Sequence, residues 1–215
     1  MIYRILWMSL LMPAIGWANV CGTDYQNFNP LTSGLDFITV HSSETLQPCY
    51  VNLGVFINYS RDTLTYTKSV GSNSIGDKAR DEMWSSDLNV GMGITKNWDA
   101  GISFPAVIST YVKDPAFSSY FKDRGFTEIR LNTKYRFTGD EHGGLAAVAT
   151  LNINTIQDNP YTGSNPGPTF GVDFVADTTL DENWAVGGNV GYRKRNPGSA
   201  LPAVPIFPMK DQFTY

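Results

Sequence analysis

The chain has 215 residues, a formal net charge of −4 at pH 7 and a hydrophobic fraction of 42%. The negative charge argues against nucleic acid as a partner, because nucleic-acid-binding domains concentrate Lys and Arg on one face. Beyond the N-terminus, no run of apolar residues approaches the roughly 18 that a membrane-spanning helix needs. The composition would also suit a soluble protein, but the alternating residues of a β-barrel give similar averages.

The N-terminus has the three parts of a secretory signal peptide. The positive charge of Arg4 precedes a short apolar run over residues 5–15. Gly16-Trp17-Ala18 then places small residues at the last and third-last positions before the expected cleavage site. We therefore expect residues 1–18 to be a signal peptide that is cleaved after Ala18. Lipidation is not expected, because the residues before Cys21 lack the small residue that should stand just ahead of a lipidated cysteine.

Residues 19–47 follow no regular period, and we expect them to form a periplasmic N-terminal segment or a plug. Within them, Leu35–Val40 fits either a short strand or a segment inserted into the mouth of a barrel. Cys21 and Cys49 are the two cysteines of the chain, and in an oxidising periplasm they are candidates for a disulfide. Such a bond would close a loop of about 28 residues and stabilise the fold by on the order of 3 kcal/mol.

From residue 48 to residue 215, much of the chain alternates between apolar and polar residues with a period of two, which is typical of β-strands with two unlike faces. The predicted strands cover 51–59, 84–95, 100–108, 127–137, 145–154, 169–177 and 184–195, and an eighth begins at Gln212. Residues 60–83 carry both charge signs without periodicity, so no strand is expected there. Pro105 cannot donate a ladder hydrogen bond, so we expect a bulge or an irregular edge around it.

Two features of this pattern predict a transmembrane β-barrel. The hairpin within Thr127–Ile156 has two strands of about eleven residues, longer than the usual five or six and long enough to cross a bilayer when tilted. Its turn is expected at Thr138–Gly144. The connections alternate long and short along the chain, as in outer-membrane barrels with short periplasmic turns and long outer loops. The sequence therefore predicts an all-β, antiparallel up-and-down transmembrane β-barrel over residues 48–215.

The predicted strands do not complete a barrel. About eight are visible and the last stops after about four residues, whereas bacterial barrels have an even number of strands and no open edge. Either residues 22–47 supply another strand or the chain is a fragment of a larger barrel, and we favour the fragment. Against it, Phe213 and Tyr215 resemble the terminal aromatic signal of many outer-membrane proteins.

Charged residues of the alternating strands are expected to face the barrel interior, because lipid would penalise an Arg or Lys by about 2–4 kcal/mol at the midplane. The predicted lumen-facing residues are Glu128, Arg130, Lys134, Arg136, Asn152, Asn154, Asp173, Asp177, Arg193 and Arg195. On the opposite, lipid-facing set, aromatic residues near strand ends are expected to form an interfacial girdle. These are Trp84, Tyr135, Phe137, Trp184 and Tyr192.

Several short sequence segments resemble those of a known family. They are Asn29-Pro30 with Gly34-Leu35-Asp36-Phe37, His41-Ser42-Ser43-Glu44-Thr45-Leu46-Gln47-Pro48, Ser85-Ser86-Asp87-Leu88-Asn89, Thr127-Glu128-Ile129-Arg130 with Lys134-Tyr135-Arg136-Phe137, and Asn196-Pro197-Gly198. Together they resemble the barrel part of Gram-negative outer-membrane proteins of the OmpA family. The arrangement is also similar to the outer-membrane transporters tied to phenol degradation. The resemblance implies a barrel without catalytic residues.

No motif for nucleotide binding, hydrolysis or metal binding is present, and the chain has only two histidines. We therefore expect no enzymatic activity, no catalytic residue, no metal and no cofactor. We predict an outer-membrane, porin-like channel or transporter for small solutes with a polar, partly basic lumen. The alternatives are a non-conducting structural barrel that anchors the envelope and a secreted β-sandwich adhesin or binding module. The expected partners are outer-membrane lipid and small solutes, with peptidoglycan only through a downstream domain that nothing in this sequence matches.

Overall fold

The structure is a computed structural model of the chain. It describes residues 30–37, 40–63, 65–70, 73–78, 81–113, 118, 120–140, 142–156, 159–162, 167–181, 184–196 and 210–215. The predicted signal peptide and Cys21 lie outside these ranges. Among the described residues, no helix is both long enough and apolar enough to span a membrane.

Almost all regular structure in the described ranges is β-strand, as the sequence predicts. The strands are β1 (Val51–Arg61), β2 (Thr65–Val70), β3 (Asn73–Lys78), β4 (Asp81–Thr95), β5 (Trp98–Val112), β6 (Gly125–Phe126), β7 (Glu128–Asp140), β8 (Gly143–Asn154), β9 (Thr169–Asp181), β10 (Trp184–Lys194) and β11 (Gln212–Thr214). A 3-10 turn, η2, covers Pro160–Thr162 in the connection between β8 and β9. The expected all-β fold is therefore confirmed.

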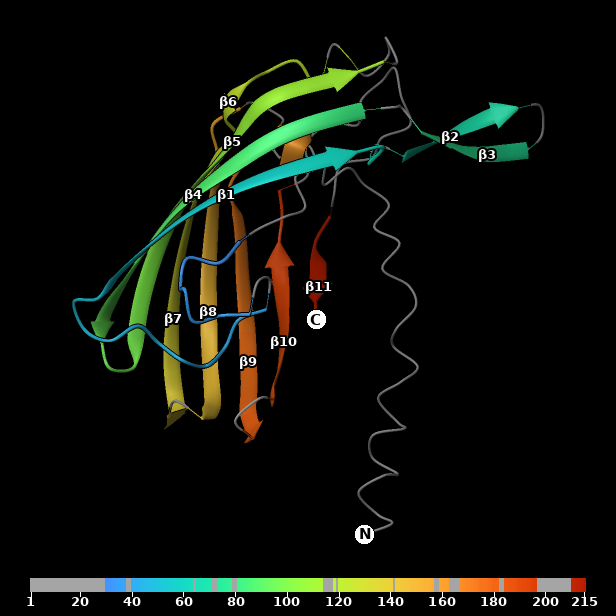
Figure 1. Cartoon of the computed structure of the whole chain (residues 1–215). Helices are drawn as coiled ribbons and strands as arrows, with labels where there is room; N and C mark the ends of the chain where they lie inside the picture. Colours follow the sequence, from blue (N-terminus) through green and yellow to red (C-terminus); the bar gives the residue numbers. More distant parts are fainter. Residues whose placement is uncertain are drawn as a thin grey trace, which may run out of the picture.

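Nine of the strands form one antiparallel sheet in the order β1-β4-β5-β7-β8-β9-β10-β11, with the short β6 paired to β5. Each long strand pairs with the next long strand in sequence, so that β1 pairs with β4 and β5 with β7. The chain therefore runs up and down through a curled sheet (Figure 1). Between the long strands of this sheet, the turns that join β4 to β5, β7 to β8 and β9 to β10 are short, and the connections from β1 to β4, β5 to β7 and β8 to β9 are long, as expected. The sheet is open, because its edge strands β1 and β11 do not pair with each other.

The structure corrects the sequence analysis in two places. The expectation that residues 60–83 contain no strand is wrong: β2 and β3 pair there as a separate two-stranded sheet, and β4 already begins at Asp81. The turn predicted at Thr138–Gly144 is too long, because β7 and β8 remain paired as far as Asp140 and Gly143. Gly139 and Gly143 have positive φ angles of 110° and 133°, a conformation that other residues rarely adopt, and so the strands extend to a tighter turn.

The irregularity expected around Pro105 is present. β5 pairs with β7 only from Trp98 to Ser103, and beyond this point β6 pairs with Ala106 and Val107. Between the two ladders, the Thr127 backbone N–H donates to the Pro105 carbonyl oxygen at 3.0 Å. β5 therefore changes its pairing partner from β7 to β6 next to Pro105, which has no backbone N–H.

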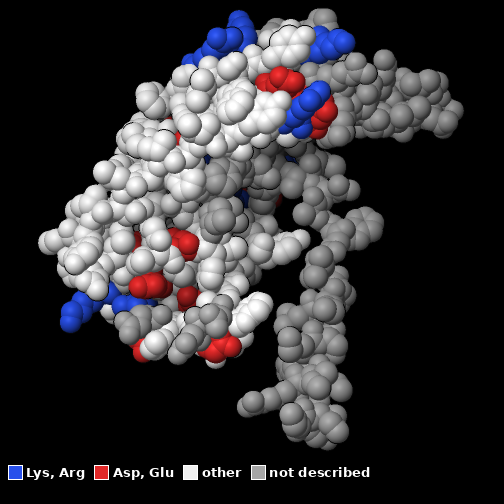
Figure 2. Space-filling model, viewed as in Figure 1, with Lys and Arg blue, Asp and Glu red and all other residues white. Residues whose placement is uncertain are grey.

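The two faces of the sheet have opposite character. Residues 30–37 and 40–48, here called the inner segment, lie against one face, which we call the inner face. On the outer face, large apolar side chains are exposed in every long strand. Examples are Leu53, Val55, Ile57, Trp84, Leu131, Tyr135, Phe174, Trp184 and Val190. In Figure 2, charged side chains gather mainly toward the two ends of the strands, and the surface between them over β1 and β4 is almost free of charge.

Candidate functional site

The inner segment crosses the inner face and contacts several strands, as Figure 1 shows. Thr32 joins two of them: its hydroxyl donates to Asn132 Oδ1 on β7 at 2.9 Å, and its carbonyl accepts from Asn52 Nδ2 on β1 at 2.9 Å. Farther along, the Ser43 N–H donates to Asp177 Oδ2 on β9 at 3.1 Å. The segment adds no strand to the sheet, and Phe37 and Val40 form only an isolated bridge. Of the two interpretations left open for Leu35–Val40, the described residues Leu35–Phe37 and Val40 favour the segment inside the curled sheet; residues 38 and 39 lie outside the described ranges.

Glycines on the inner face give the segment room to lie close to the sheet. A Cβ atom on Gly91 would be 2.4 Å from the Thr32 carbonyl oxygen, and one on Gly101 would be 2.1 Å from the Thr32 hydroxyl. A Cβ atom on Gly93 would be 2.1 Å from the Gln47 carbonyl oxygen. Any larger residue at these positions would displace the segment, because real Cβ atoms do not approach other atoms this closely.

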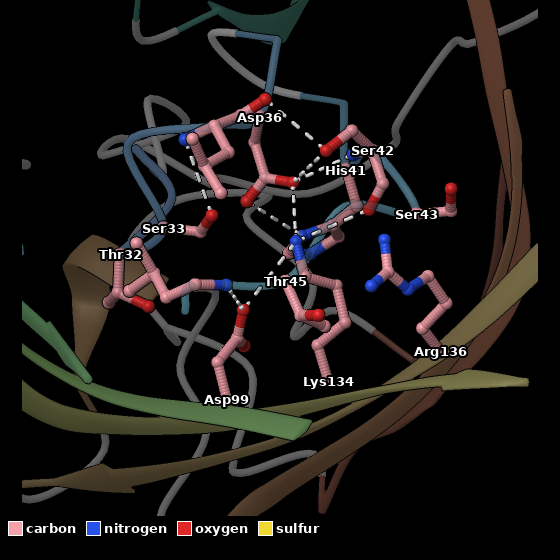
Figure 3. Close-up of polar contacts among 12 residues, drawn as sticks. Thr32, Ser33, Asp36, His41, Ser42, Ser43, Thr45, Asp99, Lys134 and Arg136 are labelled. Carbon is pink, nitrogen blue, oxygen red and sulfur yellow. Dashed lines mark hydrogen bonds and ion pairs between the residues drawn. The ribbon is translucent and has the colours of Figure 1, made fainter. Parts of the chain in front are cut away.

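A buried ammonium group fastens the segment to β7. Lys134 Nζ lies 2.9 Å from Asp36 Oδ1, 3.2 Å from the Ser42 carbonyl oxygen and 3.9 Å from Asp99 Oδ2 (Figure 3). Asp36 also accepts from the Ser42 N–H at 2.7 Å and faces His41 Nδ1 at 3.5 Å. Burial alone would raise the pKa of Asp36, but the contact with the His41 side chain and the charge of Lys134 outweigh it and lower this pKa. Asp36 is therefore a carboxylate at neutral pH.

A second buried ion-pair cluster lies farther along β7. Arg130 donates through Nη1 to Asp87 Oδ2 on β4 at 3.0 Å, and its Nε donates to Glu128. The three side chains are between 3% and 9% exposed, so water screens them little. The partly basic lumen expected from the sequence includes Arg130, Lys134 and Arg136, all on β7. In the structure, two of these basic residues, Arg130 and Lys134, are buried, and neighbouring carboxylates compensate their charges.

Three other predicted lumen-facing residues secure the ends of strands rather than lining a passage. Arg136 donates to the carbonyl oxygens of Lys96 and Asp140, at 3.0 and 3.2 Å, in two short turns. Asn154 Nδ2 donates to the Gly167 carbonyl at 3.2 Å, and Arg195 donates to the Thr162 carbonyl at 2.8 Å. Their side chains stabilise turns and loops, which the alternation of the sequence does not indicate.

The described residues leave a cavity on the other side of the inner face. A cavity of about 410 Å³ lies between the inner segment and the sheet, bounded by residues of β5 and of β7 to β11. Arg130, Asn152, Asp173 and Arg193, four of the ten predicted lumen-facing residues, line this cavity. Asp177 lies elsewhere, where it accepts from the Gly144 and Ser43 N–H groups.

Asp36, Asp87 and Asp99 are functional candidates that the sequence analysis did not select. Asp87 belongs to the polar set of β4, so the alternation of the strand is enough to predict that its side chain faces inward. Asp99 falls between the predicted strands 84–95 and 100–108, but β5 begins at Trp98 and Asp99 faces inward. Asp36 gave no signal, because the inner segment has no period from which the direction of a side chain could be inferred.

Cys49 is exposed, has a φ angle of 66° and forms no disulfide with a described residue. Its predicted partner, Cys21, lies outside the described ranges. Within those ranges, no group of three or more His, Cys, Asp or Glu side chains is placed to hold a metal ion. No protein-family model matches the chain, and no curated protein or solved structure matches it.

Proposed function

We propose that the chain forms the wall of an outer-membrane β-barrel that acts as a porin-like channel or transporter for small solutes, with the inner segment as an internal plug. One observation carries the proposal: exposed apolar side chains on the outer face stand opposite buried charges on the inner face. Leu53, Val55 and Ile57 on β1 are 72%, 70% and 68% exposed, whereas Glu128 and Lys134 on β7 are each 2% exposed.

In water the exposed apolar side chains of the outer face would be unfavourable. Exposed apolar surface costs about 25 cal/mol per Å², and contiguous patches of this kind usually mark contact with a membrane or a partner. Lipid would remove the cost on the outer face. The same lipid would penalise an Arg or Lys by about 2–4 kcal/mol at the midplane, so the charges belong on the other face.

The dimensions of the strands support a membrane location. β4 and β5 each have 15 residues, which at about 3.3 Å per residue and a tilt near 45° would span about 35 Å. The hydrocarbon core of a bilayer is about 30 Å thick. Aromatic pairs on the outer face support the expected girdle: the rings of Tyr59 and Trp84 lie 4.9 Å apart, and those of Tyr135 and Phe137 lie 5.6 Å apart.

The secreted sandwich fits these observations less well. A sandwich buries the apolar face of one sheet against the apolar face of another. Here no described element covers the outer face, and the segment packed on the inner face makes mainly polar contacts. Folding in buffer without detergent would favour the sandwich.

The non-conducting barrel remains a second candidate, since a specific observation favours it. The buried ion pairs of Arg130 and Lys134, together with the inner segment, fill much of the interior. The cavity of about 410 Å³ beside the segment favours a solute path. A planar-bilayer measurement on the refolded full chain separates the two candidates.

For the channel we expect stable conductance steps, and larger ones for Asp36→Asn, because this substitution removes the ion pair that fastens the plug. The matched control is Glu82→Gln, which weakens an exposed contact to Arg61 at the end of a strand. Protein that folds in detergent without conductance would support the non-conducting barrel. A folded monomer that is soluble without detergent would contradict both membrane proposals.

A further inference from the structure

We propose that the cavity beside the inner segment binds a small hydroxylated monocarboxylate, a compound of the sugar-acid class, and that Arg193 recognises its carboxylate. The inference rests on the proposed function only in treating this acid as the transported solute. Binding itself requires the folded chain and no conductance.

The cavity has the size and lining of a site for a small polar ligand. Its volume of about 410 Å³ falls in the usual range for ligand sites, roughly 300–1,000 Å³. Amide and hydroxyl side chains are the most numerous on the wall that the strands supply, and the inner segment adds Pro30, Leu31, Val40 and His41. A ligand with several hydroxyl groups could form hydrogen bonds with these amide and hydroxyl side chains, whereas a hydrocarbon could not.

Arg193 differs from the other basic side chains of the inner face. Arg130, Lys134, Arg136 and Arg195 each donate to an oxygen of a described residue. Arg193 lines the cavity, is half-buried and forms no hydrogen bond or ion pair with a described residue. A guanidinium group binds carboxylates in a bidentate manner, so a carboxylate in the cavity would satisfy Arg193 best.

Neighbouring side chains define the rest of the ligand. Thr150 and Asn152 on β8 line the cavity and, like Arg193, form no side-chain hydrogen bond with a described residue, so they can bind hydroxyl groups. Asp173 lines the same cavity and accepts from the Thr214 hydroxyl. Its negative charge would repel a second carboxylate on the ligand, and this favours a monocarboxylate.

Gluconate is a suitable probe, because sorbitol has the same six-carbon polyhydroxyl chain without the charge. Calorimetric titration of the full chain, refolded in a neutral detergent, would compare the two compounds. We expect gluconate to bind about tenfold or more tightly than sorbitol, the difference typical of a hydrogen bond to a charged group. We expect Arg193→Gln to remove this preference and Arg193→Lys to keep part of it.

The matched control is Lys194→Gln. It removes the same charge one residue farther along β10, where the side chain is exposed and pairs with Asp211 at 2.7 Å, away from the cavity. This variant should keep the preference for gluconate. Equal affinities for gluconate and sorbitol, no binding by folded wild-type protein, or an unchanged preference in folded Arg193→Gln would each contradict the proposal.

The wild-type comparison tests the inference even if Arg193→Gln does not fold. Conductance separates this inference from the proposed function. Gluconate binding by a protein that forms no channel would contradict transport and leave the binding site supported. Conductance without a preference for gluconate would contradict the binding site and leave the channel supported.

Discussion

Lys134 Nζ on β7 lies 2.9 Å from Asp36 Oδ1 in the inner segment, although 98 residues separate the two in sequence. Both side chains are nearly inaccessible to water, at 2% and 4% exposure. A buried pair of this kind adds little net stability, but losing one partner leaves a charge without compensation. The pair therefore holds the inner segment at a specific position on the sheet.

Asp36→Asn should lower the free energy of unfolding by about 3 kcal/mol, the lower end of the usual range, because Asp99 remains 3.9 Å from the ammonium group. Unfolding in urea, with the protein in lipid vesicles, would measure the change. Glu82→Gln should leave the stability unchanged, since its contact with Arg61 is exposed and 3.7 Å long. Equal effects of the two substitutions would show that the buried pair does not fasten the segment.

The contribution of Asp36 should also depend on pH. Because its pKa is lowered in the folded state, the carboxylate stabilises the fold above its ordinary pKa of 3.8, and this contribution is lost as the pH falls through the lowered value. The difference in stability between wild type and Asp36→Asn should therefore be constant above about pH 5 and shrink below pH 3.8. A difference that stays constant to pH 2 would contradict this assignment.

The architecture of the sheet was largely predictable from the sequence, because alternation with a period of two fixes both the strand and the face of each side chain. Asp173 and Arg193, which this rule puts on one face, line the same cavity. The hairpin formed by β2 and β3 was not predictable in this way, because apolar and polar residues do not alternate in its sequence. The path of the inner segment could not be predicted either, because it depends on long-range contacts such as that between Asp36 and Lys134.

Gly93→Ala should displace the end of the inner segment, because the new Cβ atom would lie 2.1 Å from the Gln47 carbonyl oxygen. Overpacking of this kind costs about 1–3 kcal/mol, so cleavage after Glu44 by a glutamate-specific protease should become about tenfold faster. Gly188→Ala is the control, since no atom lies within 4 Å of its added Cβ. The same cleavage rate in both variants would contradict close packing of the segment against β4.

Val55→Arg should reduce the stability of the membrane-inserted protein by about 2–4 kcal/mol, because Val55 lies near the middle of β1 on the outer face. Leu180→Arg should cost at most about 1 kcal/mol, because Leu180 is exposed in the outward-facing set of β9 beside the short turn that follows the strand. Reversible unfolding from lipid vesicles would measure both values. If the two substitutions cost the same, the outer face would not cross the hydrocarbon core.

The most direct test of the account is whether the outer face contacts lipid. Trp84, Trp98 and Trp184 are exposed near strand ends, and lipids brominated at chosen depths quench the fluorescence of tryptophans that they touch. For the chain without residues 1–18, folded in such vesicles, we predict strong quenching by bromines near the headgroups and weaker quenching by bromines at the bilayer centre. Folded protein whose fluorescence is unaffected by bromine at any depth would contradict a membrane-spanning barrel.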